Sequence, residues 1–372
     1  MNGSRKHPID DDAMASGSGL FTPEPRTGAH SDFGVGDFNL DKGLAQLQGR
    51  HNLLIYMHDN PDPDAMAAAM GLKHLVESTT DVAATLALGG IVGRAENRAM
   101  VERLHVPLIP ADVLNTNHFD TIAIVDSQPG TGNNSLPGDR DVDIVIDHHP
   151  ARQQSTHIPW CDIRPHLGAT STIVLQYLRE KNLPLHTSLA TALFYAIRSE
   201  TRDLGREATP AERDAYLFLI PQVDHHLMFR IQQPKLPGQY YETLDRALRM
   251  AQVWGDVITV NLGSIAYPDL VAEIADLLLD YEGAQFVLCC GRFGKQLFVS
   301  MRTEPSQRRA GGLMRQLIGS EGASGGHGTT AGGRLFAPIT SDSDLQMVFD
   351  HLVYRLLELT GRVGAPRMPL IR

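Results

Sequence analysis

Short apolar runs alternate with helical segments through the first half of the chain, and this alternation restricts the fold more than any other feature. Each run is mostly aliphatic or β-branched and is bounded by turn residues, which is typical of a buried strand. The runs lie at 52–57, 82–88, 121–125 and 142–146, and helix-forming segments lie at 65–76, 93–104, 170–181 and 188–198. Because such strands have no polar face, the pattern indicates an α/β fold with a mostly parallel sheet and helices on both faces.

The second half of the chain predicts a smaller α/β domain. Helices are expected at 240–254, 270–279 and 342–359, strands at 257–262, 286–290 and 296–302, and a Gly-rich segment at 319–333. At roughly 100–200 residues per domain, 372 residues predict two or three domains. The divisions are a disordered tail (1–38), a first domain (39–230), a linker with a helix (231–255) and a second domain (256–365), with the active site in the cleft between the domains.

The composition excludes several classes of protein. Thirty-three basic and 43 acidic residues give a net charge of −10, which argues against binding long duplex nucleic acid. The sequence has no run of about 18 apolar residues, so neither a spanning helix nor a membrane partner is expected. Three cysteines are too few for a disulfide framework, and the acidic N-terminus lacks the apolar region of a secretory signal. These features predict a protein of the reducing cytoplasm.

Acidic residues and histidines directly follow three of the predicted strands. His58, Asp62 and Asp64 follow the first strand, Asp126 follows the third, and Asp147-His148-His149 ends the fourth. An Asp after a single strand is usually a turn or cap residue, but in an open parallel sheet ligands bind at the carboxyl ends of the strands. Three such positions together therefore predict one polar crevice.

The chemistry of this set indicates divalent metal ions. Asp62 and Asp64 are two positions apart, so in extended backbone their side chains diverge, which suits contact with two different ions. Asp64 is also a candidate N-cap of the helix at 65–76. Carboxylates within about 4–6 Å repel by about 4 kcal/mol per pair, so the cluster requires cations. Two ions about 3.5–4 Å apart, bridged by one carboxylate, form a phosphoryl-transfer site. Oxygen ligands with imidazoles suit Mn²⁺, with Co²⁺ or Mg²⁺ as substitutes.

These motifs resemble a known family. His58-x-x-x-Asp62-x-Asp64, Asp126 and Asp147-His148-His149 are similar, in order and spacing, to the first three motifs of the DHH phosphoesterases. The resemblance implies a metal-dependent enzyme of the oligoribonuclease (nano-RNase) and phosphoadenosine-phosphate phosphatase kind.

The resemblance also implies the ligands of each ion. His58, Asp62 and Asp126 would hold the first ion. Asp64, His148 and a fourth-motif acid would hold the second, with Asp126 bridging the two. Asp147 would orient His148 through the other ring nitrogen of that histidine. His149 would face the substrate phosphate as a hydrogen-bond donor.

The C-terminal half resembles the DHH-associated domain. Residues 325–332, Gly-Gly-His-Gly-Thr-Thr-Ala-Gly, are similar to the Gly-Gly-His loop of that domain, with Thr330 where Ala is usual. The resemblance implies that Gly325, Gly326 and His327 bind the substrate, together with Arg302 from the preceding strand. In all, it covers about residues 50–340.

The fourth motif departs from the pattern of the family, which places Asp in a Ser/Thr-Asp-Thr triplet. Here the segment is Ser199-Glu200-Thr201-Arg202-Asp203, so Glu200 is the expected ligand, one methylene longer. Asp203 is an alternative ligand. A weakened second metal site, with Glu200 paired to Arg198 or Arg202, is a third interpretation.

Other features carry less weight. The Gly-rich segment at 89–97 precedes a helix, and we expect Arg94 and Asn97 either to touch the substrate or to belong to an ordinary turn. His225-His226 has no acidic cluster beside it and is expected to be structural. A dimer through the first domain is common for similar chains, although no residue here indicates it.

The predicted activity is hydrolysis of a phosphoester in short RNA, linear dinucleotides or 3′-phosphoadenosine 5′-phosphate. One alternative is an inorganic pyrophosphatase on the same metal site. The other is a nucleotide-binding sensor with little turnover, which the Glu200 and Thr330 departures favour.

Overall fold

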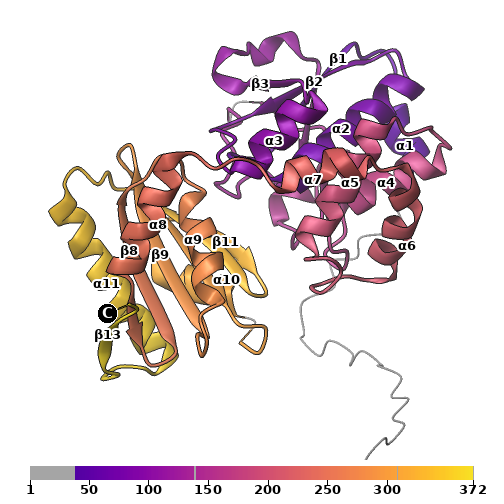
Figure 1. The fold of residues 1–372 in the computed structure, drawn as a ribbon. Helices are drawn as coiled ribbons and strands as arrows, with labels where there is room; N and C mark the ends of the chain where they lie inside the picture. The colour runs from indigo at the N-terminus through magenta and orange to yellow at the C-terminus, as the bar shows by residue number, and fades with distance from the viewer. Residues whose placement is uncertain (1–37, 138–139, 308, 372) are drawn as a thin grey trace, which may run out of the picture. The chain divides into compact units, whose positions relative to one another are not determined.

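The computed structural model describes residues 38–137, 140–307 and 309–371, except for the side chain of His327. These residues form two sheets, each with its own helices (Figure 1). The predicted tail lies outside the described residues except for Phe38, whose ring stacks on Trp160 with 5.6 Å between the centroids. None of the described helices is both long and apolar enough to cross a membrane.

The first sheet has six parallel strands in the order β3-β2-β1-β4-β5-β6. The strands are β1 (Asn52–Tyr56), β2 (Ala83–Leu88), β3 (Leu108–Pro110), β4 (Thr121–Val125), β5 (Ile144–Asp147) and β6 (Trp160–Ile163). The helices of this half are α1 (Leu40–Ala45), α2 (Pro63–Thr79), α3 (Ala95–Leu104), α4 (Thr170–Glu180), α5 (Thr187–Glu200), α6 (Pro210–Leu219) and α7 (His225–Gln232). Four 3₁₀ turns are η1 (Ala111–Val113), η2 (Thr116–His118), η3 (Gln153–Ser155) and η4 (Ile220–Gln222).

The order of the strands creates a ligand-binding position between β1 and β4. From β1 the chain moves outward through α2 to β2 and through α3 to β3, whereas from β4 it moves the other way to β5 and β6. Because β1 and β4 are neighbours, a crevice opens outside their carboxyl ends, at the switch point where such sheets bind ligands. The loops that begin at His58 and Asp126 start from these two ends, so the topology itself brings them together.

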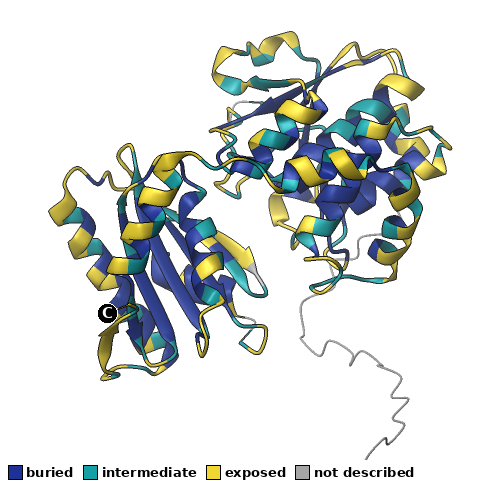
Figure 2. Ribbon diagram, in the orientation of Figure 1, coloured by how far each residue is buried: buried dark blue, intermediate teal, exposed yellow. Residues whose placement is uncertain are grey.

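Residues of β1 alternate between two hydrophobic clusters, one on each face of the sheet. Leu53 and Ile55 pack with apolar residues of α2, α4 and α5. Leu54 and Tyr56 pack in a smaller cluster with residues of η1 and the connecting loops, including Phe119. Figure 2 shows the central strands of the sheet mostly dark blue, that is, buried, whereas the edge strand β3 has no buried residue. Burial of both faces explains why the strands lack alternating polar residues.

The second sheet has seven strands in the order β11-β12-β10-β9-β8-β7-β13, with only β8 and β9 parallel among its pairs in the described residues. The strands are β7 (Gln252–Trp254), β8 (Val257–Ser264), β9 (Phe286–Phe293), β10 (Gln296–Thr303), β11 (Gly322–His327), β12 (Thr330–Leu335) and β13 (Arg367–Pro369). The helices are α8 (Gly238–Met250), α9 (Leu270–Leu279), α10 (Ala310–Ile318) and α11 (Asp342–Thr360). Residues of α8 and α9 cover one face, and residues of α10 and α11 cover the other.

Two differences from the sequence interpretation concern the second half. The helix expected at 240–254 ends at Met250, because Gln252–Trp254 pairs with β8 and β13 and so belongs to the sheet. The Gly-rich segment at 319–333 forms the β11–β12 hairpin. Its glycines obscured the strand pattern, since a strand without side chains shows no alternation. The helix α6 was also absent from the sequence interpretation, but its start has a recognisable sequence signature, the capping box Thr209-Pro-Ala-Glu212.

Two glycines in helices predict opposite effects of the same substitution. A Cβ on Gly71 in α2 would lie 2.5 Å from Val174 Cγ1 of α4, whereas a Cβ on Gly312 in α10 would meet nothing within 4 Å. We therefore expect Gly71→Ala to destabilise the fold by about 1–3 kcal/mol through overpacking. Gly312→Ala is expected to stabilise it by about 0.5–1 kcal/mol through helix propensity. Urea denaturation of both variants tests this, and equal shifts of the midpoint would contradict the close packing of α2 on α4.

Candidate metal centre

The loop after β1 is fixed by the start of α2. Asp62 is the N-cap of α2, and its Oδ1 accepts hydrogen bonds from the backbone N–H groups of Asp64 (2.9 Å) and Ala65 (3.0 Å). Pro63 occupies the first helical position, where its missing N–H costs nothing. The expectation that Asp64 caps this helix is therefore wrong, because the helix begins two residues earlier than the sequence suggested.

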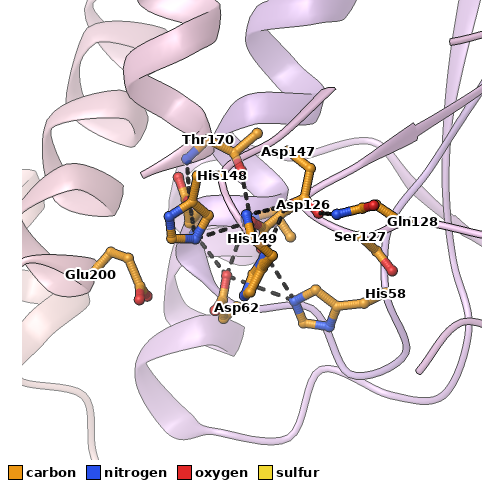
Figure 3. A network of polar contacts seen from close by, with 12 residues as sticks. His58, Asp62, Asp126, Ser127, Gln128, Asp147, His148, His149, Thr170 and Glu200 are labelled. Atoms are coloured by element: carbon orange, nitrogen blue, oxygen red, sulfur yellow. Dashed lines mark hydrogen bonds and ion pairs between the residues drawn. The ribbon is translucent and has the colours of Figure 1, made fainter. Parts of the chain in front are cut away.

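Asp126 lies at the centre of the cluster. It follows β4 with φ +56°, a left-handed conformation that is uncommon for a residue with a side chain and that aims its carboxylate into the crevice. Its Oδ2 lies 3.6 Å from His58 Nε2, and its Oδ1 lies 3.7 Å from His148 Nε2 (Figure 3). The Thr170 hydroxyl donates to Oδ1 at 2.7 Å. The two oxygens of one buried carboxylate thus face two different histidines.

His58, Asp62 and Asp126 form the first group of candidate ligands. One ligand atom of each lies within 4.8 Å of the others, and His58 Nε2 is 3.9 Å from Asp62 Oδ1. The other ring nitrogen of His58 donates to the backbone carbonyl of Asp59 at 2.9 Å, which directs Nε2 to the carboxylates. Ligand atoms bound about 2.1 Å from one divalent ion lie about 3–4 Å apart, so the spacing fits a shared ion.

The second group joins His148 and Asp64 to the other side of Asp126. His148 Nε2 is 4.0 Å from Asp64 Oδ2, and His148 Nδ1 lies 3.3 Å from the carbonyl of Leu167. Asp64 accepts from the backbone N–H groups of Thr170 (2.7 Å) and Ser171 (2.8 Å), so it caps α4. Because a carboxylate oxygen has two lone pairs, this cap still leaves Asp64 able to bind a metal ion.

Asp147 orients His149 and not His148, which corrects the role expected from the sequence. Its Oδ1 accepts from the backbone N–H (3.1 Å) and ring Nδ1 (2.8 Å) of His149, and its Oδ2 accepts from Gln128 Nε2 (2.7 Å). The Nδ1 atom of His148 instead lies 3.3 Å from the carbonyl of Leu167, in the loop before α4. Asp126, His148 and His149 also form a close group, but the His149 atom in it is already bonded to Asp147.

Glu200 lies at the end of α5. It does not belong to either set of described residues whose ligand atoms lie within 4.8 Å of one another, His58/Asp62/Asp126 and Asp126/His148/His149. Its Oε1 pairs with Arg206 Nη2 at 3.4 Å, and Figure 3 draws no contact from it to the other labelled residues. Its charge still acts on Asp64 and His149. Asp203 pairs with Arg198 and its side chain is 58% exposed, so the fold turns this alternative ligand toward solvent.

The pKa values show how the cluster holds its charge without metal ions. Burial favours neutral His58, but hydrogen bonds to Asp126 and Asp62 raise its pKa well above the usual value. Burial, followed by the charges of Asp126, Asp62 and Glu200, raises the pKa of Asp64 well above its usual value. Burial opposes the charge of His149, yet Asp147 raises its pKa to about 10. Protons therefore occupy the cluster where cations are absent.

The residues present fit divalent ions. The donor set combines three carboxylates with two imidazoles, all of them partly or fully buried, and each imidazole has its other ring nitrogen directed by a backbone carbonyl. Hard oxygens with imidazole suit Mn²⁺ and its substitutes better than a structural zinc site. The structure thus supports a metal centre of His58, Asp62, Asp64, Asp126 and His148, with Glu200 beside it.

Removing divalent ions is expected to lower the melting temperature, and by more at pH 8 than at pH 6. The raised pKa values of His58, His149 and Asp64 mean that the metal-free fold loses stability as pH rises through them. Metal binding needs deprotonated ligands and adds about 2.7 kcal/mol when the ion is at 100 times its Kd. Calorimetry in EDTA and in Mn²⁺ tests this. Identical melting temperatures at pH 8 would contradict the metal centre.

Two cavities meet at the cluster. Cavity A, of about 460 Å³, is lined by His58, Asp62, Arg94, Asn97, Glu200, Arg202, Arg206, Asp276 and Arg302, among others. Cavity B, of about 660 Å³, is lined by Asp126, Asp147, Arg152, Arg315, Gly325, Gly332 and Arg334, among others. The residues that line both are Asp59, Asn60, His149, Phe298, Gly326, Gly332 and Gly333.

The predicted substrate-binding residues line these cavities, but several are already engaged. Arg302 binds Asp276 through Nε at 2.6 Å, and Arg94 lies 3.4 Å from the same carboxylate. Asn97 is buried, with Nδ2 donating to the carbonyl of Pro61 at 3.3 Å. The side chain of His327 lies outside the described part of the structure. No sequence pattern indicated Asp276, which already pairs with the arginines expected to bind phosphate.

The fold and the site define a class: doubly wound α/β proteins that gather carboxylates and imidazoles for divalent ions at the switch point of the sheet. Residues 52–197 match the N-terminal domain of the DHH family, so this part of the chain is a DHH family domain.

Known proteins share either the sequence or the fold of this chain. An uncharacterized protein of Methanocaldococcus jannaschii is 31% identical over 316 residues, which is 83% of this chain and 64% of that protein. A probable manganese-dependent inorganic pyrophosphatase of Deinococcus radiodurans is 29% identical over 171 residues, 45% of this chain and 53% of the relative. The chain thus spans less than two thirds of either.

A solved structure extends the likeness to both sheets. An exopolyphosphatase-related protein from Bacteroides fragilis has a TM-score of 0.64 and covers 86% of this chain and 98% of its own, at 14% identity. At this identity the likeness shows the fold alone. It includes the second sheet, which the family match at 52–197 does not reach.

Proposed function

We propose that this protein is a metal-dependent phosphoesterase acting on short oligoribonucleotides, linear dinucleotides or 3′-phosphoadenosine 5′-phosphate. The observation that carries the proposal is Asp126, whose two oxygens face His58 and His148 at 3.6 and 3.7 Å. One carboxylate between two sets of nitrogen and oxygen donors suits a pair of divalent ions, of which Mn²⁺ is our first choice. Such ions supply Lewis acidity toward phosphoryl oxygens.

The other residues have roles that follow from their contacts. Asp147 accepts from Nδ1 of His149, so that nitrogen carries a proton and the ring is held in place. His149 lines both cavities and is expected to donate to the reacting phosphate from Nε2. Gln128 donates a hydrogen bond to Asp147, and the Thr170 hydroxyl donates one to Asp126, so both carboxylates are fixed in orientation. The second sheet, as a DHH-associated domain, would supply the remaining wall.

A panel of substrates tests this proposal. Short RNAs, linear and cyclic dinucleotides, 3′-phosphoadenosine 5′-phosphate and pyrophosphate are assayed side by side with Mn²⁺, with Asp126→Ala as the control. We expect Mn²⁺-dependent release of nucleotide products from at least one short nucleotide, and none from the control. If Mn²⁺-loaded protein leaves every nucleotide in the panel intact, the proposal is wrong.

Inorganic pyrophosphatase is the second candidate, favoured by the match to a probable manganese-dependent pyrophosphatase. That match covers 45% of this chain, so more than half of the chain lies outside it. Pyrophosphate turnover faster than dinucleotide turnover in the same panel would favour this candidate.

A nucleotide-binding sensor is the third candidate, and the Glu200–Arg206 pair favours it. This pair keeps Glu200 outside the groups of described ligand atoms. Tight nucleotide binding without Mn²⁺-dependent hydrolysis would support this candidate. Gain of activity in Glu200→Asp would identify the fourth motif as the weak point.

A further inference from the structure

An aromatic ring and a guanidinium lie side by side on one face of the second sheet. Phe298 of β10 is directly opposite Arg334 of β12 in the antiparallel register. Residues directly opposite each other in such a pair share a face, with Cβ atoms about 4.5–5.5 Å apart. Phe298 is half-buried, lines both cavities, and touches Phe293 edge-on with 6.5 Å between the ring centroids. One side of the ring is thus supported while the residue still lines open space.

The face of the sheet next to this pair carries glycines, which have no side chains to fill the space above it. Ser300 lies two residues after Phe298 on β10 and is opposite Gly332 of β12. Gly332 is in turn opposite Gly325 of β11. A Cβ on Gly325 would meet nothing within 4 Å, and one on Gly332 would meet only a backbone oxygen at 3.9 Å. Because residues two apart share a face, Phe298, Arg334, Gly325 and Gly332 form one surface, which we call the Phe298 platform. Its glycines leave room for a flat group beside the ring.

Charge distinguishes the two cavities. In cavity A, Arg94, Arg202 and Arg302 all contact Asp276 within 3.4 Å, and Arg206 contacts Glu200 at the same distance. Each of these cations already faces a carboxylate, which weakens its attraction for an anion.

In cavity B the cations have no such partners. Within the described ranges, Arg152, Arg315 and Arg334 make no ion pair with a carboxylate. Arg152 and Arg334 donate from their guanidinium groups to the carbonyls of Gly130 and Gly132, each at 3.4 Å. The acids that line this cavity are Asp126 and Asp147 of the cluster, and Asp59, which accepts from Ser135 at 2.7 Å. Cavity B is therefore the one whose arginines are not paired with a carboxylate in the described residues, so they can attract an anion.

We propose that the Phe298 platform binds a nucleobase and the phosphate next to it, in cavity B beyond His149. Phe298 would stack on the base, and Arg334 would hold the phosphate. Every base has a π-face, so such a site accepts single-stranded chains of any sequence. The preferred substrate then extends at least one nucleotide beyond the reacting phosphate, which favours oligonucleotides over pyrophosphate. Placement of the reacting phosphate one nucleotide away rests on the proposed function. Binding of a base and a phosphate at the platform does not depend on it.

Two variants and two matched controls test the platform. Arg334→Gln removes the charge and Phe298→Leu removes the stacking surface. Arg249→Gln removes an equivalent charge from an exposed position on α8, and Phe336→Leu replaces a ring that is 66% exposed. The probe is a fluorescently labelled penta-adenylate, whose Kd is measured by anisotropy with the full-length protein in EDTA, so that no turnover is needed.

We expect each platform variant to raise the Kd about tenfold and neither control to change it. The slope of log Kd against log salt should fall by about 0.7 in Arg334→Gln, as for loss of one phosphate contact to a single strand. Arg334→Lys should recover part of the affinity. With Mn²⁺, the ratio of kcat/KM for penta-adenylate to that for bis(p-nitrophenyl) phosphate should fall about tenfold in both variants.

Wild-type affinity in both platform variants, or an equal loss in the controls, would overturn the inference. If Phe298→Leu does not fold, Arg334→Gln decides alone, because its side chain is partly exposed. Absence of any hydrolysis, with the platform effects on the Kd intact, would reject the proposed function and leave the binding site standing.

Discussion

Replacing Asp126 with asparagine is expected to reduce metal-dependent hydrolysis by more than about a hundredfold while leaving the fold in place. Loss of a residue that only supports a metal ligand costs about 10–100-fold, and Asp126 faces both groups of ligands. Asparagine keeps the shape of the side chain and tolerates the left-handed backbone at φ +56°. The substitution therefore removes the charge without adding the strain that alanine would bring.

Titration calorimetry with Mn²⁺ and steady-state kinetics measure this effect. The expected result is weaker binding of Mn²⁺ and a loss of kcat, with the circular dichroism spectrum unchanged. Asp203→Asn is the matched control, since Asp203 is an exposed carboxylate paired with Arg198. Wild-type Mn²⁺ affinity in Asp126→Asn would remove the basis of the metal centre, and a comparable loss in Asp203→Asn would restore Asp203 as a ligand.

Replacing His149 with glutamine is expected to lower kcat by about 10²–10³-fold with little change in Mn²⁺ affinity. That range is typical of losing one hydrogen-bond donor to the charge that develops in the transition state. Asp147 occupies Nδ1 of His149 at 2.8 Å, so the donor to the substrate is Nε2, which carries a proton only in the imidazolium form. Asp147 raises the pKa of His149 to about 10, against the effect of burial, and so favours that form.

The pH dependence gives a second readout of the same residue. Bound cations oppose the imidazolium charge and lower its pKa, so the decline in kcat is expected below pH 10. Activity should fall as pH rises through this lowered pKa, because the proton on Nε2 is lost. His149→Gln should lack this decline, and His157→Gln, an exposed histidine, should keep it. A decline that persists unchanged in His149→Gln would assign it to another group.

Much of the first sheet and the identity of the loop residues could be read from the sequence. The strand at 121–125 and the helix at 270–279 were predicted residue for residue, because buried strands and amphipathic helices carry strong hydrophobic patterns. Short elements were harder. β3 has three residues and β6 four, too few for a periodic signal. The glycines of β11 and β12 removed the pattern altogether.

The sequence by itself determined which chemistry the site contains: histidines and aspartates placed directly after apolar strands, in the order of the DHH motifs. Parallel strands bring their carboxyl ends to one edge, so this part of the site follows from local order along the chain.

Only the tertiary structure decided the partner of each side chain. It joined Asp64 to the start of α4, Asp147 to His149, Glu200 to Arg206 and Arg302 to Asp276. Three of these contacts link residues between two and 26 positions apart, and the fourth spans 106. Hydrogen bonds and ion pairs act over only a few ångströms, so the choice among many polar partners depends on packing that no sequence pattern records.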